Sequence, residues 1–144
     1  MKKIIAIVMC MCTLISFAVT GNAQNDVKIL LDGTEMKSDV AAFIENDRTM
    51  VPARAIFESM GAQVTWDAEN KTVLMVRQKD SEFTSVVLQI GLDYAFVNSE
   101  RVELDSPAMI KNDRTFVPLR FVIEAFDEGI KWDGETKTVS IVTK

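Results

Sequence analysis

The sequence contains no histidine and has only two cysteines among its 144 residues. Histidine is the commonest transition-metal ligand and the usual general base near neutral pH, so its absence counts against metal-dependent and acid–base enzymes. Both cysteines, Cys10 and Cys12, lie close to the N-terminus within an apolar run. We therefore expect a folded region without a free thiol or a disulfide, stabilised by ordinary packing.

Basic residues are also scarce. The chain has 16 Lys and Arg against 21 Asp and Glu, which gives a formal net charge of −5. Loss of Lys2 and Lys3 with the N-terminal segment would change this charge to −7. Phosphate backbones are bound by clustered Lys and Arg, and the sequence has no such cluster, so nucleic acid is not an expected partner.

The N-terminal segment has the pattern of a secretory signal peptide. Lys2 and Lys3 precede an uncharged run over residues 4–19, and small residues follow up to Ala23. This pattern predicts cleavage after Ala23 and a secreted or cell-surface protein. The alternative is a retained membrane anchor, but the run is shorter than the ~20 residues that span a bilayer. We expect no stable membrane insertion after cleavage.

The rest of the chain contains one sequence unit written twice. Residues 46–54 recur at residues 112–120, an offset of 66, and the same offset relates more distant pairs without a gap. Those pairs are Glu58 and Glu124, Trp66-Asp67 and Trp132-Asp133, Glu69 and Glu135, and Lys71-Thr72-Val73 and Lys137-Thr138-Val139. We place repeat one at about 26–77 and repeat two at about 84–144. Each repeat is too short to bury enough apolar surface for stable folding on its own, so residues 24–144 are expected to form one domain.

Each repeat is predicted to hold a short helix that follows a proline. Apolar residues recur at helical spacing after Pro52 and after Pro118, and each proline suits the first helical position. Gly61 is expected to end the first helix in the left-handed conformation. Asp127 stands at that place in the second repeat, so the second helix is expected to end differently, near Gly129.

Strand-like runs surround each helix. The predicted hairpins pair residues 27–31 with 34–36, 64–66 with 72–77, 94–97 with 100–104, and 130–132 with 138–142. A further strand is expected over residues 84–90, and its counterpart in repeat one would fall in the signal peptide. The predicted fold class is α+β: two pseudo-repeated units, each a short helix packed on small antiparallel β-hairpins, sharing one core.

These motifs resemble a known family, the stalk domain also called the copper amine oxidase N-terminal-like domain. Its signature resembles Asn-Gly-Arg-Thr-hydrophobic-Val-Pro-Leu-Arg, followed by a helix with Glu-Ala-hydrophobic-Gly, then Val-x-Trp-Asp and Thr-Lys-Thr-Val. Here Asp47 and Asp113 replace the usual glycine before Arg, and repeat two lacks the glycine that ends the helix. The resemblance implies an appended stalk that holds neither copper nor the quinone cofactor. We therefore expect no metal and no cofactor.

Trp66 and Trp132 are the only tryptophans, and each precedes an aspartate, Asp67 or Asp133. Flat aromatic faces beside carboxylates are typical of carbohydrate-binding surfaces, which makes these four residues the candidate binding residues. The alternative is that each Trp covers the core beside its helix. Asp67 and Asp133, with Glu69 and Glu135, lack the ligand number and the glycine of a calcium loop and are interpreted as hairpin tips.

Four charged residues recur on the helices. Arg54 and Glu58 are four residues apart, as are Arg120 and Glu124, so each pair can form an ion pair on its helix. One interpretation is a clamp for an anion or a sugar acid. The other, favoured by the repetition, assigns these residues to a structural signature with Pro52 and Pro118.

No catalytic residues are assigned, because no serine has a basic partner and no phosphate-binding loop is present. The sequence predicts a secreted, non-catalytic structural or interaction module of the cell envelope, with a wall polysaccharide or an envelope protein as partner. The alternatives are a carbohydrate or wall-binding module that uses Trp66 and Trp132, and a small hydrolase with paired carboxylates. Function is expected where the repeats differ, around residues 84–90 and on the exposed sheet faces.

Overall fold

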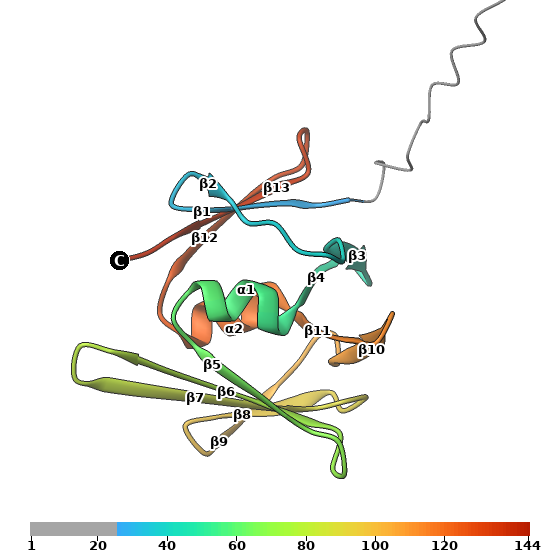
Figure 1. The fold of residues 1–144 in the computed structure, drawn as a ribbon, viewed down its shortest axis with the longest axis vertical. Coiled ribbons are helices and arrows are strands. Elements are labelled where there is room, and N and C mark those ends of the chain that lie inside the picture. The colour runs from blue at the N-terminus through green and yellow to red at the C-terminus, as the bar shows by residue number, and fades with distance from the viewer. Residues whose placement is uncertain (1–25) are drawn as a thin grey trace, which may run out of the picture.

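The computed structural model describes residues 26–144 (Figure 1). The predicted signal peptide, residues 1–23, lies outside the described residues. The described part contains two helices and thirteen short strands. The elements are β1 (Lys28–Leu31), β2 (Thr34–Glu35), β3 (Phe43–Glu45), β4 (Arg48–Pro52), α1 (Ala53–Ser59), β5 (Gln63–Asp67), β6 (Thr72–Lys79), β7 (Glu82–Gln89), β8 (Tyr94–Val97), β9 (Glu100–Glu103), β10 (Met109–Lys111), β11 (Arg114–Pro118), α2 (Leu119–Ala125), β12 (Gly129–Asp133) and β13 (Thr138–Val142). Within this part, no helix has the length and apolar character needed to cross a membrane.

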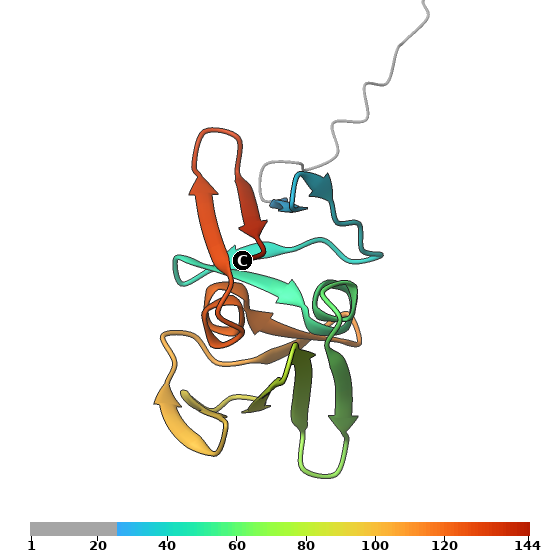
Figure 2. The ribbon, with the colours of Figure 1, turned by 90° about the vertical axis from the view of Figure 1, so that its left-hand side faces the viewer.

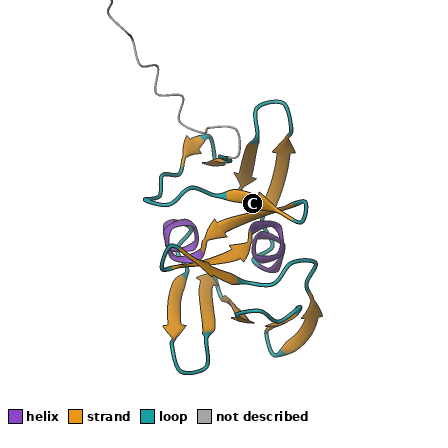
Figure 3. Cartoon of the chain, turned by 90° about the vertical axis from the view of Figure 1, so that its right-hand side faces the viewer, coloured by secondary structure: helices purple, strands orange, loops and turns teal. Residues whose placement is uncertain are grey.

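The strands form three sheets. Their orders are β12-β13-β1-β2, β10-β11-β4-β3 and β5-β6-β7-β8-β9. The two helices lie between the first sheet and the five-stranded sheet, with the short strands β3, β4, β10 and β11 beside them (Figure 1). Figures 2 and 3 show both helices end-on in the middle of the molecule, with one long hairpin on either side. The α+β class predicted from the sequence is confirmed.

The centre of the fold is the antiparallel pair β4 and β11. Val51 lies opposite Val117, with Met50 opposite Pro118 and Pro52 opposite Phe116. The separation of Val51 and Val117 along the chain equals the offset of the sequence repeat. The ladder therefore pairs matching positions of the two sequence copies, and each helix begins directly after one of the two central strands.

Each outer sheet combines strands from both halves of the chain. The hairpin β5–β6 is extended by β7 and then by β8 and β9, whereas the hairpin β12–β13 is extended by β1 and β2. Strand β1 runs parallel to β13, with Lys28 opposite Thr138 and Leu31 opposite Ile141. The predicted hairpins are antiparallel, but the expectation of purely antiparallel sheets is wrong at this pair of strands. The five-stranded sheet shows the reason for the difference. There β7 lies between β6 and β8 and pairs antiparallel with both, whereas no described strand lies between β13 and β1.

The hairpins β3–β4 and β10–β11 were not predicted, because their strands are short and close a tight turn. In the first turn Asn46 and Asp47 have φ angles of 51° and 59°, and Asn112 and Asp113 have the same values in the second turn. Two successive left-handed residues define the tight turn that matches the twist of paired strands. The Asn-Asp pairs are thus turn residues, as the sequence indicated, but each joins two strands.

The helices begin one residue later than predicted. Pro52 and Pro118 are the N-cap residues, with ψ angles of 118° that continue the preceding strand. The prediction for the end of the second helix is also wrong. Helix α2 ends at Ala125, and Asp127 adopts a φ of 58°, at the place where Gly61 has a φ of 85°. Hydrogen bonds from the following amides to the last helical turn enforce this ending in both helices, whichever residue is present.

The two halves share one hydrophobic core. Phe57 of α1 and Phe126 beyond α2 meet edge to face, with ring centroids 6.0 Å apart. Val51, Leu119 and Ile123 are fully buried in the same cluster. Such aromatic and aliphatic side chains each stabilise the fold by roughly 1.5–3 kcal/mol when removed from water. The region between the helices and the three sheets is therefore the main source of stability.

Candidate functional site

The two tryptophans occupy matching places on β5 and β12 and differ in exposure. Trp66 lies opposite Val73 and Trp132 lies opposite Val139. Trp66 is partly buried and packs against the hydrophobic core. Trp132 is 42% exposed, and its indole Nε1 lies beside Gly134. Trp66 thus fits both interpretations given by the sequence, whereas Trp132 presents an accessible aromatic face.

Asp67 and Asp133 close the hairpin turns that follow the tryptophans. Asp67 Oδ1 accepts hydrogen bonds from the amides of Glu69 (3.0 Å) and Asn70 (3.2 Å), and its Oδ2 accepts one from the Asn70 side chain (2.8 Å). Asp133 Oδ1 accepts the equivalent bond from Glu135 (3.0 Å). The Asn70 hydrogen bonds lower the pKa of Asp67. The carboxylates are therefore committed to turn formation and lie on the hairpin loops.

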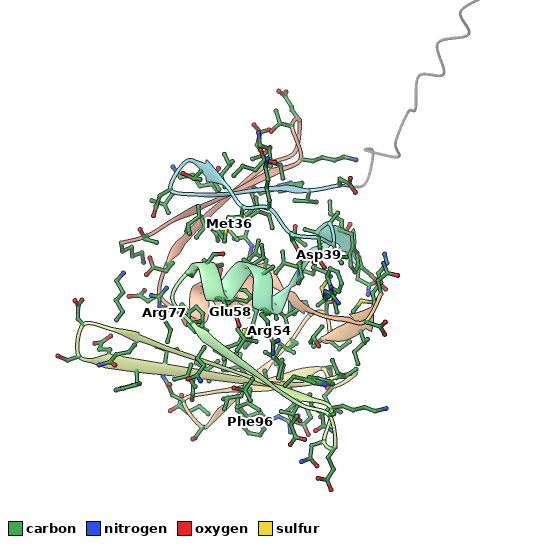
Figure 4. All side chains as sticks on the ribbon, in the orientation of Figure 1. Met36, Asp39, Arg54, Glu58, Arg77 and Phe96 are labelled. Atoms are coloured by element: carbon green, nitrogen blue, oxygen red, sulfur yellow. The ribbon has the colours of Figure 1, made fainter. Side chains whose placement is uncertain are left out.

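The helical ion pairs predicted from the sequence are confirmed. Arg54 Nε lies 3.5 Å from Glu58 Oε1, and Arg120 Nη1 lies 3.9 Å from Glu124 Oε1. All four side chains are about half exposed, and Figure 4 shows Arg54 and Glu58 on the surface of α1. At this exposure such pairs add little to stability. Each arginine keeps donor groups that face solvent.

Two further ion pairs join the halves of the chain and were missed in the sequence. Arg48 donates to Asp105 from Nε and Nη2, at 3.2 Å and 2.7 Å. Arg114 donates from Nη2 to Asp39, lowers the pKa of that carboxylate, and has its own pKa raised. Asp39 and Asp105 are also related by the repeat offset, which was the one available signal. Neither aspartate lies in a recognisable motif.

A groove of about 570 Å³ lies beside Trp132. One wall comes from the start of α2 and from β12, with Arg120, Phe121 and Trp132. The opposite wall comes from the turn between β3 and β4, with Arg48, and Asp105 lies at the rim. The groove thus has an aromatic surface, two guanidinium groups and several carboxylates.

A second groove of about 640 Å³ lies beside Trp66. Its walls come from the start of α1, with Arg54 and Ala55, and from the turn between β10 and β11, with Arg114. Asp39 takes the place that Asp105 has in the first groove. The structure therefore brings the predicted residues Arg54 and Trp66 into one groove, and Arg120 and Trp132 into the other.

The segment between the repeats is mainly structural. Strand β7 lies in the middle of the five-stranded sheet, and its inward residues Val86 and Leu88 are fully buried. The outward face of this sheet exposes Leu74 and Phe96, and Figure 4 shows Phe96 on the side away from the helices. Residues 84–90 thus contribute to the core and line neither of the two grooves beside the tryptophans.

A buried charge cluster lies at the end of α2. Glu128, whose side chain is 1% exposed, accepts hydrogen bonds at 2.6 Å from both Arg77 and Lys79. Burial raises the pKa of Glu128, but the bonds from Lys79 and Arg77 outweigh it, so the net pKa lies below its usual value. Arg77 also covers the ring of Phe126 at 4.9 Å. The charged groups of this cluster are engaged with one another, and we interpret their role as structural.

The described residues offer no group of three or more His, Cys, Asp or Glu side chains placed to hold a metal ion. The fold and its grooves define a small, β-rich α+β domain with two open surface sites. Residues 30–141 match the family model of the copper amine oxidase N-terminal domain, and the chain belongs to that family. This family is an accessory domain and is distinct from the catalytic domain of the oxidase. No curated protein matches the chain.

Proposed function

We propose that this protein is a secreted, non-catalytic interaction module of the cell envelope. Its membership of an accessory-domain family is the observation that carries the proposal. The N-terminal segment has the features of a signal peptide cleaved after Ala23. The antiparallel pairing of Val51 with Val117, which stand at matching positions of the sequence repeat, supports a chain built from two copies of one unit. Exchange of strands between the copies gives a rigid platform for partner binding.

Localisation is tested by expressing the full chain in a Gram-positive host and separating medium, wall, membrane and cytosol. The mature protein is expected in the medium or wall fraction, with Gln24 as its first residue by N-terminal sequencing. A full-length chain confined to the membrane would favour a retained anchor. A full-length chain in the cytosol would contradict secretion.

The accessible face of Trp132 favours a second, more specific function, which is binding of a wall carbohydrate. Sugar rings stack on aromatic faces, and their hydroxyl groups bond to charged side chains that are already held in place. The groove beside Trp132 offers both, through the indole and the Arg48–Asp105 pair. Carbohydrate binding is the alternative that the sequence left open.

Co-sedimentation of the mature protein with intact cell wall, with purified wall polysaccharide and with wall protein separates the two partners. Binding to the polysaccharide that is lost in Trp132→Ala supports carbohydrate recognition. Phe83→Ala is a matched control, because Phe83 is 65% exposed and lies outside both grooves. Binding to the protein fraction alone would support the general interaction function and contradict the carbohydrate function.

A further inference from the structure

The two grooves are built from the same positions of the sequence copies. Arg120 and Trp132 line one groove, and their counterparts in the first copy, Arg54 and Trp66, line the other. The opposing wall also corresponds, with Arg48 in the first groove and Arg114 in the second.

Each groove is completed by the other copy. The turn that carries Arg48 belongs to the first half of the chain, yet it closes the groove beside Trp132. The turn that carries Arg114 belongs to the second half and closes the groove beside Trp66. This exchange follows from the pairing of β4 with β11, because each central strand begins at the turn that lines one groove and ends at the helix that lines the other. One copy alone would form neither groove.

The chemistry of the grooves suits an uncharged, hydroxyl-rich chain. Arg48 is bonded to Asp105 and Arg114 to Asp39, so donors and acceptors stand side by side with little local excess of positive charge. Carboxylates outnumber guanidinium groups in the groove beside Trp132, and the whole chain is acidic. A polyanion would be repelled, whereas a neutral glycan would find both kinds of hydrogen-bond partner and an aromatic face.

We infer that the domain is bivalent, with two corresponding sites for an uncharged glycan chain, one beside Trp132 and one beside Trp66. The inference rests on the carbohydrate function proposed above. The sites differ in strength, because Trp132 is more exposed and Phe121 takes the place that Ala55 has in the other groove. A larger aromatic surface gives the Trp132 site the higher affinity. A bivalent domain links two glycan strands and gains avidity on a polymer.

The test is isothermal titration calorimetry of the mature protein with hexamers of N-acetylglucosamine and of glucose as separate probes. Two ligands per chain are expected, with unequal affinities. Trp132→Ala is expected to weaken the tighter site about 5- to 30-fold and leave the weaker one. Phe83→Ala is expected to change neither site.

Replacement of the partly buried Trp66 could reduce binding by unfolding the protein, so the weaker site is also tested with a variant that is expected to increase binding. Ala55→Phe copies Phe121 into the second groove and is expected to strengthen the weaker site several-fold, while Arg54→Ala on the exposed helix surface weakens it. One ligand per chain, with no effect of either variant, would overturn bivalence and leave carbohydrate binding intact. Undiminished binding in the Trp66→Ala, Trp132→Ala double variant would overturn the groove assignment. No binding of either probe by the wild type would overturn both this inference and the carbohydrate function.

Discussion

Arg48 holds Asp105 through two hydrogen bonds to the same carboxylate oxygen, although the two residues are 57 positions apart. The pair joins the turn between β3 and β4 to the loop that follows β9 and forms the rim of one groove. The side chains are 42% and 75% exposed, so water screens their attraction. The pair therefore positions the groove wall more than it stabilises the fold.

We predict that a double-mutant cycle on Arg48→Gln and Asp105→Asn gives a coupling energy of only about 0.2–1 kcal/mol, the range for exposed pairs. Urea unfolding of the four proteins measures it. The coupling should shrink further in 1 M salt, because the Debye length falls to about 3 Å. A coupling above about 2 kcal/mol, well outside the range for exposed pairs, would show that the pair is a structural staple.

The buried cluster should behave in the opposite way. Glu128→Ala leaves Arg77 buried without its carboxylate and is expected to cost about 3–5 kcal/mol of unfolding free energy. Glu124→Ala is the matched control, since Glu124 pairs with Arg120 on the exposed face of α2. Only a small loss is expected for the control. Equal losses in the two variants would contradict a special role for burial.

The pH dependence of stability follows from the same residue. The folded-state pKa of Glu128 lies below its ordinary value, so its contribution is present above about pH 4.3 and is lost as the pH falls through the folded-state pKa. The unfolding free energy should therefore decrease below about pH 4.3. Glu128→Gln should flatten this decrease, measured by urea unfolding between pH 7 and pH 3. An unchanged slope in the variant would assign the acid sensitivity to other carboxylates, such as Asp39.

The two helix ends provide a reciprocal test. Gly61 has a φ of 85°, so Gly61→Ala is expected to cost about 1 kcal/mol, although open space surrounds the new methyl group. Asp127 has a φ of 58°, and Asp127→Gly is expected to stabilise by up to about 1 kcal/mol. Thermal unfolding of both variants checks the opposite signs. The same sign for both would show that these positions are not equivalent helix ends.

The tight turns before the helices allow a second gain in stability. Asp47 and Asp113 are left-handed residues in turns that favour Asn-Gly. Asp47→Gly and Asp113→Gly are each expected to raise the unfolding free energy by about 0.5–1 kcal/mol, measured by urea unfolding. Asp47→Ala is the control and should be destabilising, because alanine gains nothing in the left-handed region. Destabilisation by glycine would indicate a further role for the aspartate side chain.

Local patterns were sufficient to predict most elements. The proline followed by helical spacing located the start of both helices to within one residue, and alternation with turn residues located β1, β5, β6, β7, β8 and β9. The failures were local as well. The strands around Asn46-Asp47 are too short for alternation to be recognised. The absence of glycine at Asp127 predicts a later helix end than the one that the backbone hydrogen bonds impose.

Only part of the candidate site was predicted from the sequence. Trp132 and Arg120 were predicted from the repeat, because an aromatic residue beside charged groups is recognisable in one segment. Asp105 and the role of Arg48 were not, because ion pairing between distant segments leaves no local spacing to detect.

The sequence by itself determined the two copies, the constant offset between them and the helix and hairpins within each, because these depend on contacts between near neighbours. Tertiary structure alone decided that β4 pairs with β11, that β1 runs parallel to β13, and that each groove is closed by the turn of the other copy. The same local sequence pattern is compatible with two arrangements: each unit could fold separately, or the two units could exchange strands. The choice is made by burial of a shared core, to which residues from the whole length of the domain contribute.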